Sequence, residues 1–136
     1  MVTTAVAVAA LATLGSVLAA RAARPGGEVL PEPTAFRAGT CRTIAEPLLA
    51  VARLEPALAG AREVPAADLG RVAAAQKRLL AAHPRAEADV AVPLRDLVTA
   101  LGYVRLRSDS RSYDPAVWRE ADLRRRAVQG LCTVTR

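Results

Sequence analysis

Apolar residues recur along this chain at intervals of three and four, the spacing of one face of an α-helix. Four such stripes follow one another, and stretches rich in Pro, Gly or polar residues separate them. No segment of useful length alternates with period two, so we expect no β-sheet. The stripes are Cys41, Ile44, Leu48, Val51 and Leu58; Leu69, Val72, Gln76 and Leu79; Val90, Leu94, Leu97, Leu101 and Val104; and Val117, Ala121, Arg124, Val128 and Leu131.

Prolines and capping residues indicate the limits of these helices. Thr43 and Glu46 have the spacing of a capping box for the first helix, and Pro56 is expected to bend or break its last turn. Asp114-Pro115 combines an N-cap residue with a proline at the first helical position of the fourth helix. Residues 105–113 are expected to form a polar loop.

Four helices with short connections predict an all-α fold, a small up-down-up-down four-helix bundle. That topology brings the start of the first helix and the end of the fourth to the same end of the bundle. Cys41 and Cys132 occupy these two positions. We therefore expect one disulfide between them, and the alternative is two buried free thiols.

An apolar segment precedes the helical region and predicts export. Val2–Ala20 carries no charged side chain, and Ala20-Arg21-Ala22 is an A-x-A cleavage site. We expect residues 1–23 to be a signal peptide or a membrane-anchor helix in contact with the membrane, 24–39 a Pro/Gly linker, and 40–136 the helical bundle domain. Since disulfides persist outside the cytosol, the protein is expected to be extracytoplasmic, either secreted or anchored to the cell membrane.

The charges around the apolar segment favour the opposite orientation. No basic residue precedes the segment, whereas Arg21 and Arg24 follow it. By the positive-inside rule, this order would place the domain in the cytoplasm. We reconcile it with the cysteine argument by expecting either that the true start lies upstream or that the α-amine replaces the basic residues.

The chain has a net charge of +6, and Lys77 is its only lysine. This balance favours anionic partners such as phospholipid headgroups. Because exported proteins rarely meet nucleic acid, we expect no nucleic-acid partner. Heavy use of Arg and Ala is also typical of a high-GC genome, which weakens any functional interpretation of single arginines.

The sequence carries no motif for catalysis, a metal or a cofactor. The only histidine, His83, precedes a proline at a helix end, and no Ser lies near it in sequence. The most distinctive polar segment is the 105–113 loop. Its candidate contacts with an anion or a partner are Arg105, Arg107, Arg111 and Tyr113, and the alternative is a solvated connector.

Periodicity also places polar residues in the core. Gln76 and Arg124 interrupt two stripes, and a rise of about 1.5 Å per residue puts Glu46 and Pro93 at the same level of the bundle. Glu46, Gln76 and Arg124 are therefore a candidate buried polar layer. It would bind a small anion or fix the register of the helices; alternatively, Arg124 reaches the surface from a narrow stripe.

These observations favour an exported, non-enzymatic helical module that binds a protein partner or the anionic cell envelope. One alternative is a carrier of a small ligand, either haem or a small anion, with His83, Tyr103 and Tyr113 as the available axial ligands. A remote alternative is an all-helical enzyme of chorismate mutase type, for which Gln76, Lys77, Arg78 and Arg124 are suitable residue types. No motif places these residues in a site.

Overall fold

A computed structural model describes residues 27–133 of the 136-residue chain. The predicted signal or anchor segment lies outside the described residues. Between residues 27 and 133 the fold is all-helical, and no helix there is long and apolar enough to cross a membrane. The elements are η1 (Pro33–Ala35), α2 (Thr40–Ala52), α3 (Glu55–Leu58), α4 (Ala66–Ala82), η2 (His83–Arg85), α5 (Ala88–Asp109) and α6 (Pro115–Cys132).

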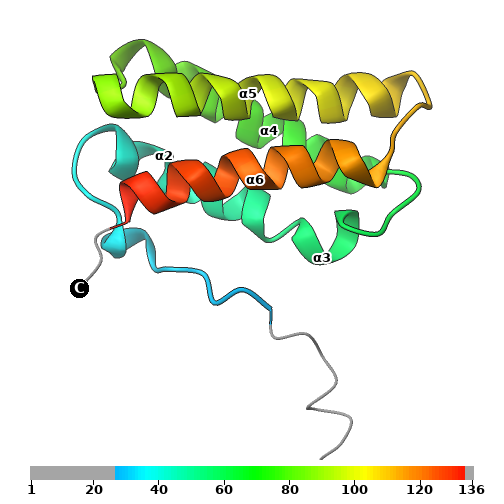
Figure 1. The fold of residues 1–136 in the computed structure, drawn as a ribbon, viewed down its shortest axis with the longest axis horizontal. Helices are drawn as coiled ribbons and strands as arrows, with labels where there is room; N and C mark the ends of the chain where they lie inside the picture. Colours follow the sequence, from blue (N-terminus) through cyan, green and yellow to red (C-terminus); the bar gives the residue numbers. More distant parts are fainter. Residues whose placement is uncertain (1–26, 134–136) are drawn as a thin grey trace, which may run out of the picture.

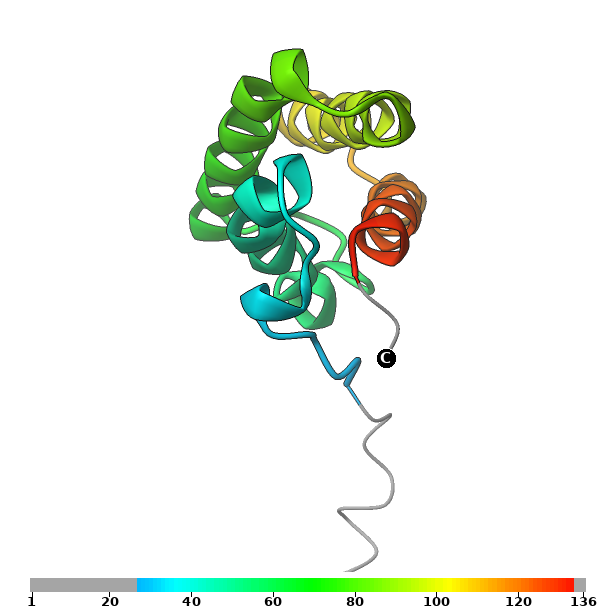
Figure 2. The same ribbon diagram turned by 90° about the vertical axis from the view of Figure 1, so that its left-hand side faces the viewer.

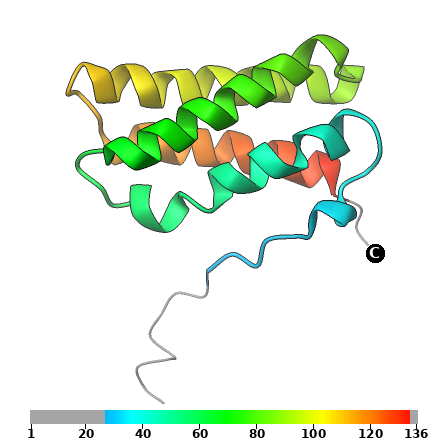
Figure 3. The ribbon, with the colours of Figure 1, turned by 180° about the vertical axis from the view of Figure 1, so that it is seen from behind.

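The four long helices α2, α4, α5 and α6 form the body of the domain. Figure 1 shows that successive long helices run in alternating directions, with α5 and α6 side by side. Seen nearly end-on in Figure 2, the four helices surround a common centre. Figure 3, from behind, shows α4 running obliquely between α2 and α5, both of which it contacts.

The predicted stripes of the first and third helices form most of the core. Ile44, Leu48 and Val51 of α2 are fully buried, as is the stripe of α5 from Val90 to Val104. Leu58 is also buried, but it belongs to α3, because the helix stops at Ala52 before Pro56. The expected interruption by Pro56 is thus confirmed.

The disulfide between Cys41 and Cys132 is confirmed, and it joins the start of α2 to the end of α6. Both cysteines are buried, and their Cα atoms lie 5.2 Å apart. The bond closes a loop of 91 residues in sequence. Helix directions and cysteine positions, which are independent features of the sequence, therefore agree in the fold.

The packed region begins before residue 40, which corrects the predicted linker. Phe36 is only 1% exposed and belongs to the core. Its backbone pairs with Thr133 in an isolated antiparallel bridge, and Arg37 N donates to Cys132 O at 2.9 Å. The chain's only phenylalanine buries a large apolar surface, and this burial outweighs the Pro and Gly content of the segment.

The predicted capping box at Thr43 and Glu46 is wrong, because α2 begins earlier. Its N-cap is Gly39, with φ of +83°, and the Thr43 hydroxyl donates back to the Gly39 carbonyl. The carboxylate of Glu87, 47 positions along the chain, accepts from Thr40 N at 3.1 Å instead. A long-range contact thus performs the capping that a local motif was expected to provide.

The buried face of α6 is displaced by one residue from the predicted stripe. Trp118, Ala121, Arg125, Val128 and Cys132 are buried, whereas the side chain of Arg124 is 46% exposed and Leu131 is 43% exposed. Ala121 and Val128 belong to both possible stripes, so they do not decide between them. The start of α6 follows the prediction, since Asp114 Oδ1 accepts from Ala116 N at 2.6 Å.

Candidate functional site

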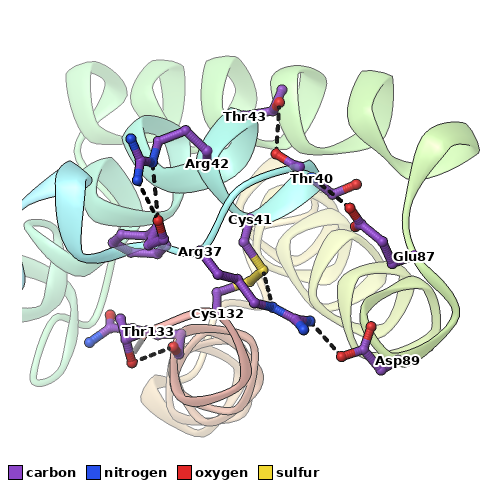
Figure 4. The surroundings of a disulfide bond; sticks show 12 residues. Arg37, Thr40, Cys41, Arg42, Thr43, Glu87, Asp89, Cys132 and Thr133 are labelled. Atoms are coloured by element: carbon purple, nitrogen blue, oxygen red, sulfur yellow. Dashed lines mark hydrogen bonds and ion pairs between the residues drawn. A yellow bond between two sulfur atoms is a disulfide. The ribbon is translucent and has the colours of Figure 1, made fainter. Parts of the chain in front are cut away.

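The disulfide end of the bundle is held by several long-range contacts. Figure 4 shows Arg37 between Cys41 and Asp89, where its Nε donates to Cys41 Sγ at 3.3 Å and its Nη2 pairs with the Asp89 carboxylate. On the other side, Thr40 Oγ1 donates to the Arg85 carbonyl at 3.1 Å. These contacts fix the start of α2 against the turn between α4 and α5.

A hollow of about 670 Å³ opens beside this junction. Its walls come from the start of α2, the end of α4 and the turn that follows α4. They consist of small residues, two threonines, three arginines and one glutamate: Ala38, Gly39, Thr40, Arg42, Thr43, Arg78, Ala81, Ala82, Arg85 and Glu87. A volume of this size is typical of small-ligand sites.

The three arginines of the hollow differ in how they are bound. Arg42 is structural, because its Nη2 donates to the Phe36 carbonyl at 2.7 Å and to the Thr34 carbonyl at 3.2 Å. Between residues 27 and 133, the side chains of Arg78 and Arg85 form no ion pair or hydrogen bond, and both residues are exposed. The hollow therefore has two guanidinium groups available for an anion.

Glu87 is the one acidic residue that lines the hollow, and its carboxylate is already engaged. Hydrogen bonding to Thr40 is the main cause that lowers the pKa of Glu87, the backbone of Glu87 itself is the next, and Arg37 adds a smaller electrostatic effect. These causes favour the charged form of the Glu87 carboxylate, which contacts the first residue of α2. The junction thus holds one anion of the chain itself, and Arg78 and Arg85 remain unneutralised.

The outer face of α4 extends this basic character. The exposed charged residues of α4 are Arg71, Lys77 and Arg78, and no acidic residue of α4 is exposed. Asp68, the helix's single acid, is buried and accepts from Arg71 Nη1 at 2.7 Å. The remaining exposed positions are small, apart from Leu80. This face offers cations without competing carboxylates.

The structure does not assemble the predicted 105–113 loop into one surface. Helix α5 continues to Asp109, so Arg105 and Arg107 are helical and point about 200° apart. Arg105 Nη1 donates to Gln76 Oε1 at 2.8 Å, whereas Arg107 faces the groove between α5 and α6. Arg111 lies in the turn, with φ of +55°. Whether these arginines contact a partner remains a prediction.

Tyr113 has a structural role in the described fold. It is half-buried, and its hydroxyl donates to the Leu58 carbonyl at 3.1 Å, which ties α3 to the turn before α6. Burial raises the pKa of this phenol, with smaller contributions from the charges of Asp114 and Glu55. The hydroxyl therefore stays protonated and keeps its hydrogen bond.

The predicted buried polar layer does not form. Glu46 and Arg124 are exposed, and Arg124 Nε pairs with Glu120 at 2.7 Å on the surface of α6. Gln76 is half-buried, and its Nε2 donates to the Val98 carbonyl at 3.0 Å rather than to a carbonyl freed by Pro93. Arg124 lies outside the core because the buried face of α6 is displaced by one residue from the predicted stripe. Glu46 is on the exposed face of α2.

A different buried arginine, which the sequence analysis missed, takes this place. Arg125 is fully buried, and its Nε donates to Asp122 Oδ1 at 2.7 Å. Its Nη2 pairs with Glu28 Oε2 at 2.7 Å, and its Nη1 donates to Gln129 Oε1 at 2.6 Å. The spacing of large residues could have indicated this arginine. Trp118 and Cys132 are 14 residues apart, and position 125 lies between them on the same helix face.

A second hollow, of about 570 Å³, lies between α5 and α6. Its lining includes Ala100, Ala116, Val117 and Tyr103, and Tyr103 is 54% exposed. Its charged residues carry both signs, namely Asp96, Arg107, Glu120 and Arg124. The groove suits an amphipathic surface better than a small anion.

The geometry thus provides a basic hollow at the disulfide end, a mixed groove between α5 and α6, and a buried arginine cluster. Within residues 27–133, no three His, Cys, Asp or Glu side chains gather as a candidate metal site. Comparison of the chain with protein-family models, with curated proteins and with solved structures gave no significant match.

Proposed function

We propose that this chain is an extracytoplasmic, non-enzymatic binding module that holds phosphate groups of the anionic cell envelope at the hollow of the disulfide end. The observation that supports the proposal is the pair of unneutralised arginines, Arg78 and Arg85, on the walls of one hollow. Guanidinium groups present paired N–H donors that match the oxygens of a phosphate.

The acid-free face of α4 supports an extended anionic surface as the target. Lys77 lies next to Arg78 in α4 and is also exposed, so it can add to the attraction of an anionic surface. An anionic leaflet attracts each nearby Lys or Arg with about 1 kcal/mol. A headgroup phosphate in the hollow would then be held by Arg78 and Arg85, while the helix face follows the membrane surface.

The test uses the full chain and removes the two arginines together as Arg78→Ala/Arg85→Ala. Binding is measured by co-sedimentation with two kinds of vesicle. One contains phosphatidylcholine alone, and the other contains phosphatidylcholine with roughly 30% phosphatidylglycerol, which makes the leaflet moderately anionic. The difference between the two vesicles isolates the charge-dependent part from any contribution of the apolar N-terminal segment. We expect this part to weaken by about 30-fold, the equivalent of roughly 2 kcal/mol.

A matched control removes the same charge elsewhere. Arg62→Ala/Arg119→Ala also deletes two exposed arginines that form no ion pair or side-chain hydrogen bond within residues 27–133, and neither lines the hollow. If both double variants lose the same affinity, binding depends only on net charge and the proposal fails. Competition by inorganic phosphate separates the two phosphate sources: displacement at millimolar phosphate would assign the hollow to free phosphate rather than to a headgroup.

A protein partner is the second candidate, and the groove between α5 and α6 favours it. Both helices carry exposed apolar side chains: Tyr103, which lines the groove, and Leu106 on α5, and Leu123 on α6, are each more than half exposed. Exposed groups of this kind mark protein contacts more often than anion sites. A Tyr103→Ser/Leu123→Ser variant that loses capture of a membrane protein, but keeps vesicle binding, would favour this function over the first.

A further inference from the structure

The buried Arg125 carries a carboxylate-binding site that the protein fills with its own N-terminal segment. The carboxylate of Glu28 faces donors from three side chains of α6. Arg125 approaches it through Nη2 at 2.7 Å and Nη1 at 3.4 Å, Arg126 Nη2 lies 3.4 Å away, and Gln129 Nε2 lies 3.5 Å away. Two guanidiniums and an amide on one carboxylate constitute a formed receptor.

The charges of the cluster balance only when Glu28 is present. Arg125 and Arg126 share Asp122, whose two oxygens accept from the Nε atoms of both arginines at 2.7 Å. Asp122 and Glu28 together offset the two guanidiniums. Without Glu28 the cluster keeps one excess positive charge, and Arg125 is fully buried. Arg125 would then keep its ion pair with Asp122 but lose the one at Nη2, so a carboxylate at that position is favoured.

Few other contacts hold Glu28 in place. Its neighbours Gly27 and Val29 are exposed, Val29 to 93%, and only Leu30 packs partly against the core. Within the described chain, no backbone hydrogen bond joins residues 27–31 to the bundle. The attachment of this extended segment therefore depends mainly on one carboxylate, which another carboxylate can replace.

We propose that Arg125, Arg126 and Gln129 form a carboxylate site that takes the acidic side chain of an extended peptide once Glu28 leaves. The ligand class follows from the present occupant, a glutamate in an extended segment without secondary structure. The site is separate from the hollow of the disulfide end, and neither Arg78 nor Arg85 contributes to it. Its success or failure is therefore independent of the proposed phosphate binding.

Chemical rescue in the full chain tests the site. Glu28→Ala removes the carboxylate and leaves space, whereas Glu28→Gln keeps the shape without the charge. We expect Glu28→Ala to lower the melting temperature by about 5–10 °C. Sodium acetate should restore at least half of this loss relative to sodium chloride of equal ionic strength. Glu32→Ala, in the same segment and exposed, should leave both the melting temperature and the acetate response unchanged.

Peptide titration into the full-length Glu28→Gln chain provides the second measurement, since this variant keeps the packing of the segment. The probe is a synthetic peptide with the sequence of residues 27–36, with Glu or Gln at position 28. Calorimetry should show at least tenfold tighter binding of the Glu peptide, because only its carboxylate restores the ion pair at Arg125 Nη2. Equal binding of the two peptides, or no acetate response in Glu28→Ala, would overturn the proposal. Asp122 and Gln129 alone would then satisfy the Arg125 guanidinium.

Discussion

Gly39 is the position where a single added methyl group should have the largest local effect on the candidate site. Its φ of +83° and ψ of −143° fall in a region that residues with a Cβ rarely adopt. A Cβ built there would also collide with Oε1 of Glu87, the oxygen that accepts from Thr40 N. The backbone strain alone costs about 1–3 kcal/mol. We therefore expect Gly39→Ala to lower the melting temperature by about 5–15 °C.

The matched control is Gly70→Ala on the exposed face of α4. No heavy atom lies within 4 Å of the Cβ it would add, and its backbone is helical. Alanine is the better helix former by about 0.5–1 kcal/mol, so this substitution should stabilise the protein. Thermal unfolding followed by circular dichroism should then show shifts of opposite sign for the two Gly→Ala variants.

A double variant separates the two causes. In Glu87→Ala the collision partner is gone, so a further Gly39→Ala change should cost only the backbone strain. If Gly39→Ala melts at the temperature of the parent, the left-handed residue is not required, and the explanation of the start of α2 is wrong. If Glu87→Ala leaves the effect of Gly39→Ala unchanged, the collision contributes nothing.

Two further predictions concern the covalent bond and the register of α6. Reduction of Cys41–Cys132 should lower the free energy of unfolding by about 4–5 kcal/mol, since the bond restricts a loop of 91 residues in the unfolded chain. An unchanged guanidinium midpoint after reduction would contradict this. Arg124→Ala should cost under about 1 kcal/mol as an exposed pair, whereas Arg125→Ala should cost about 3–5 kcal/mol because it breaks the ion pairs of a fully buried arginine with Asp122 and Glu28. Equal losses in urea unfolding would refute the assigned register.

The predictable part of the fold depended on patterns within single helices. The stripe of α5 contains five apolar residues with no competing face, and all of them are buried. In α6 two faces compete, because Ala121 and Val128 fit both. Val117 and Leu131 led the sequence analysis to place Arg124 on the buried face. In the structure, the buried Trp118 sets the register of α6 and places Arg125 there instead. A large aromatic buries more area than either aliphatic residue, so its position is the better guide to register.

The candidate site was not predictable from local sequence. Thr40 meets Glu87 across 47 positions, and Arg125 meets Glu28 across 97. Both are single polar contacts between segments that no periodicity relates. The 105–113 segment was misassigned for a different reason: its polar residues favour a loop, but it contains no Pro or Gly to end α5 before Asp109. Hydrophilic composition by itself does not end a helix.

Several long-range contacts hold the disulfide end of the bundle, and this bears on function. At the disulfide end, the Cys41–Cys132 bond, the Phe36–Thr133 bridge and the contact of Thr40 with Glu87 join three separate segments of the chain. The walls of the hollow near Gly39 are therefore fixed before any ligand arrives. A preformed site loses little conformational freedom on binding, so weak phosphate contacts at Arg78 and Arg85 retain more of their energy as affinity. These contacts are a physical reason to seek the anion site at the disulfide end of the molecule.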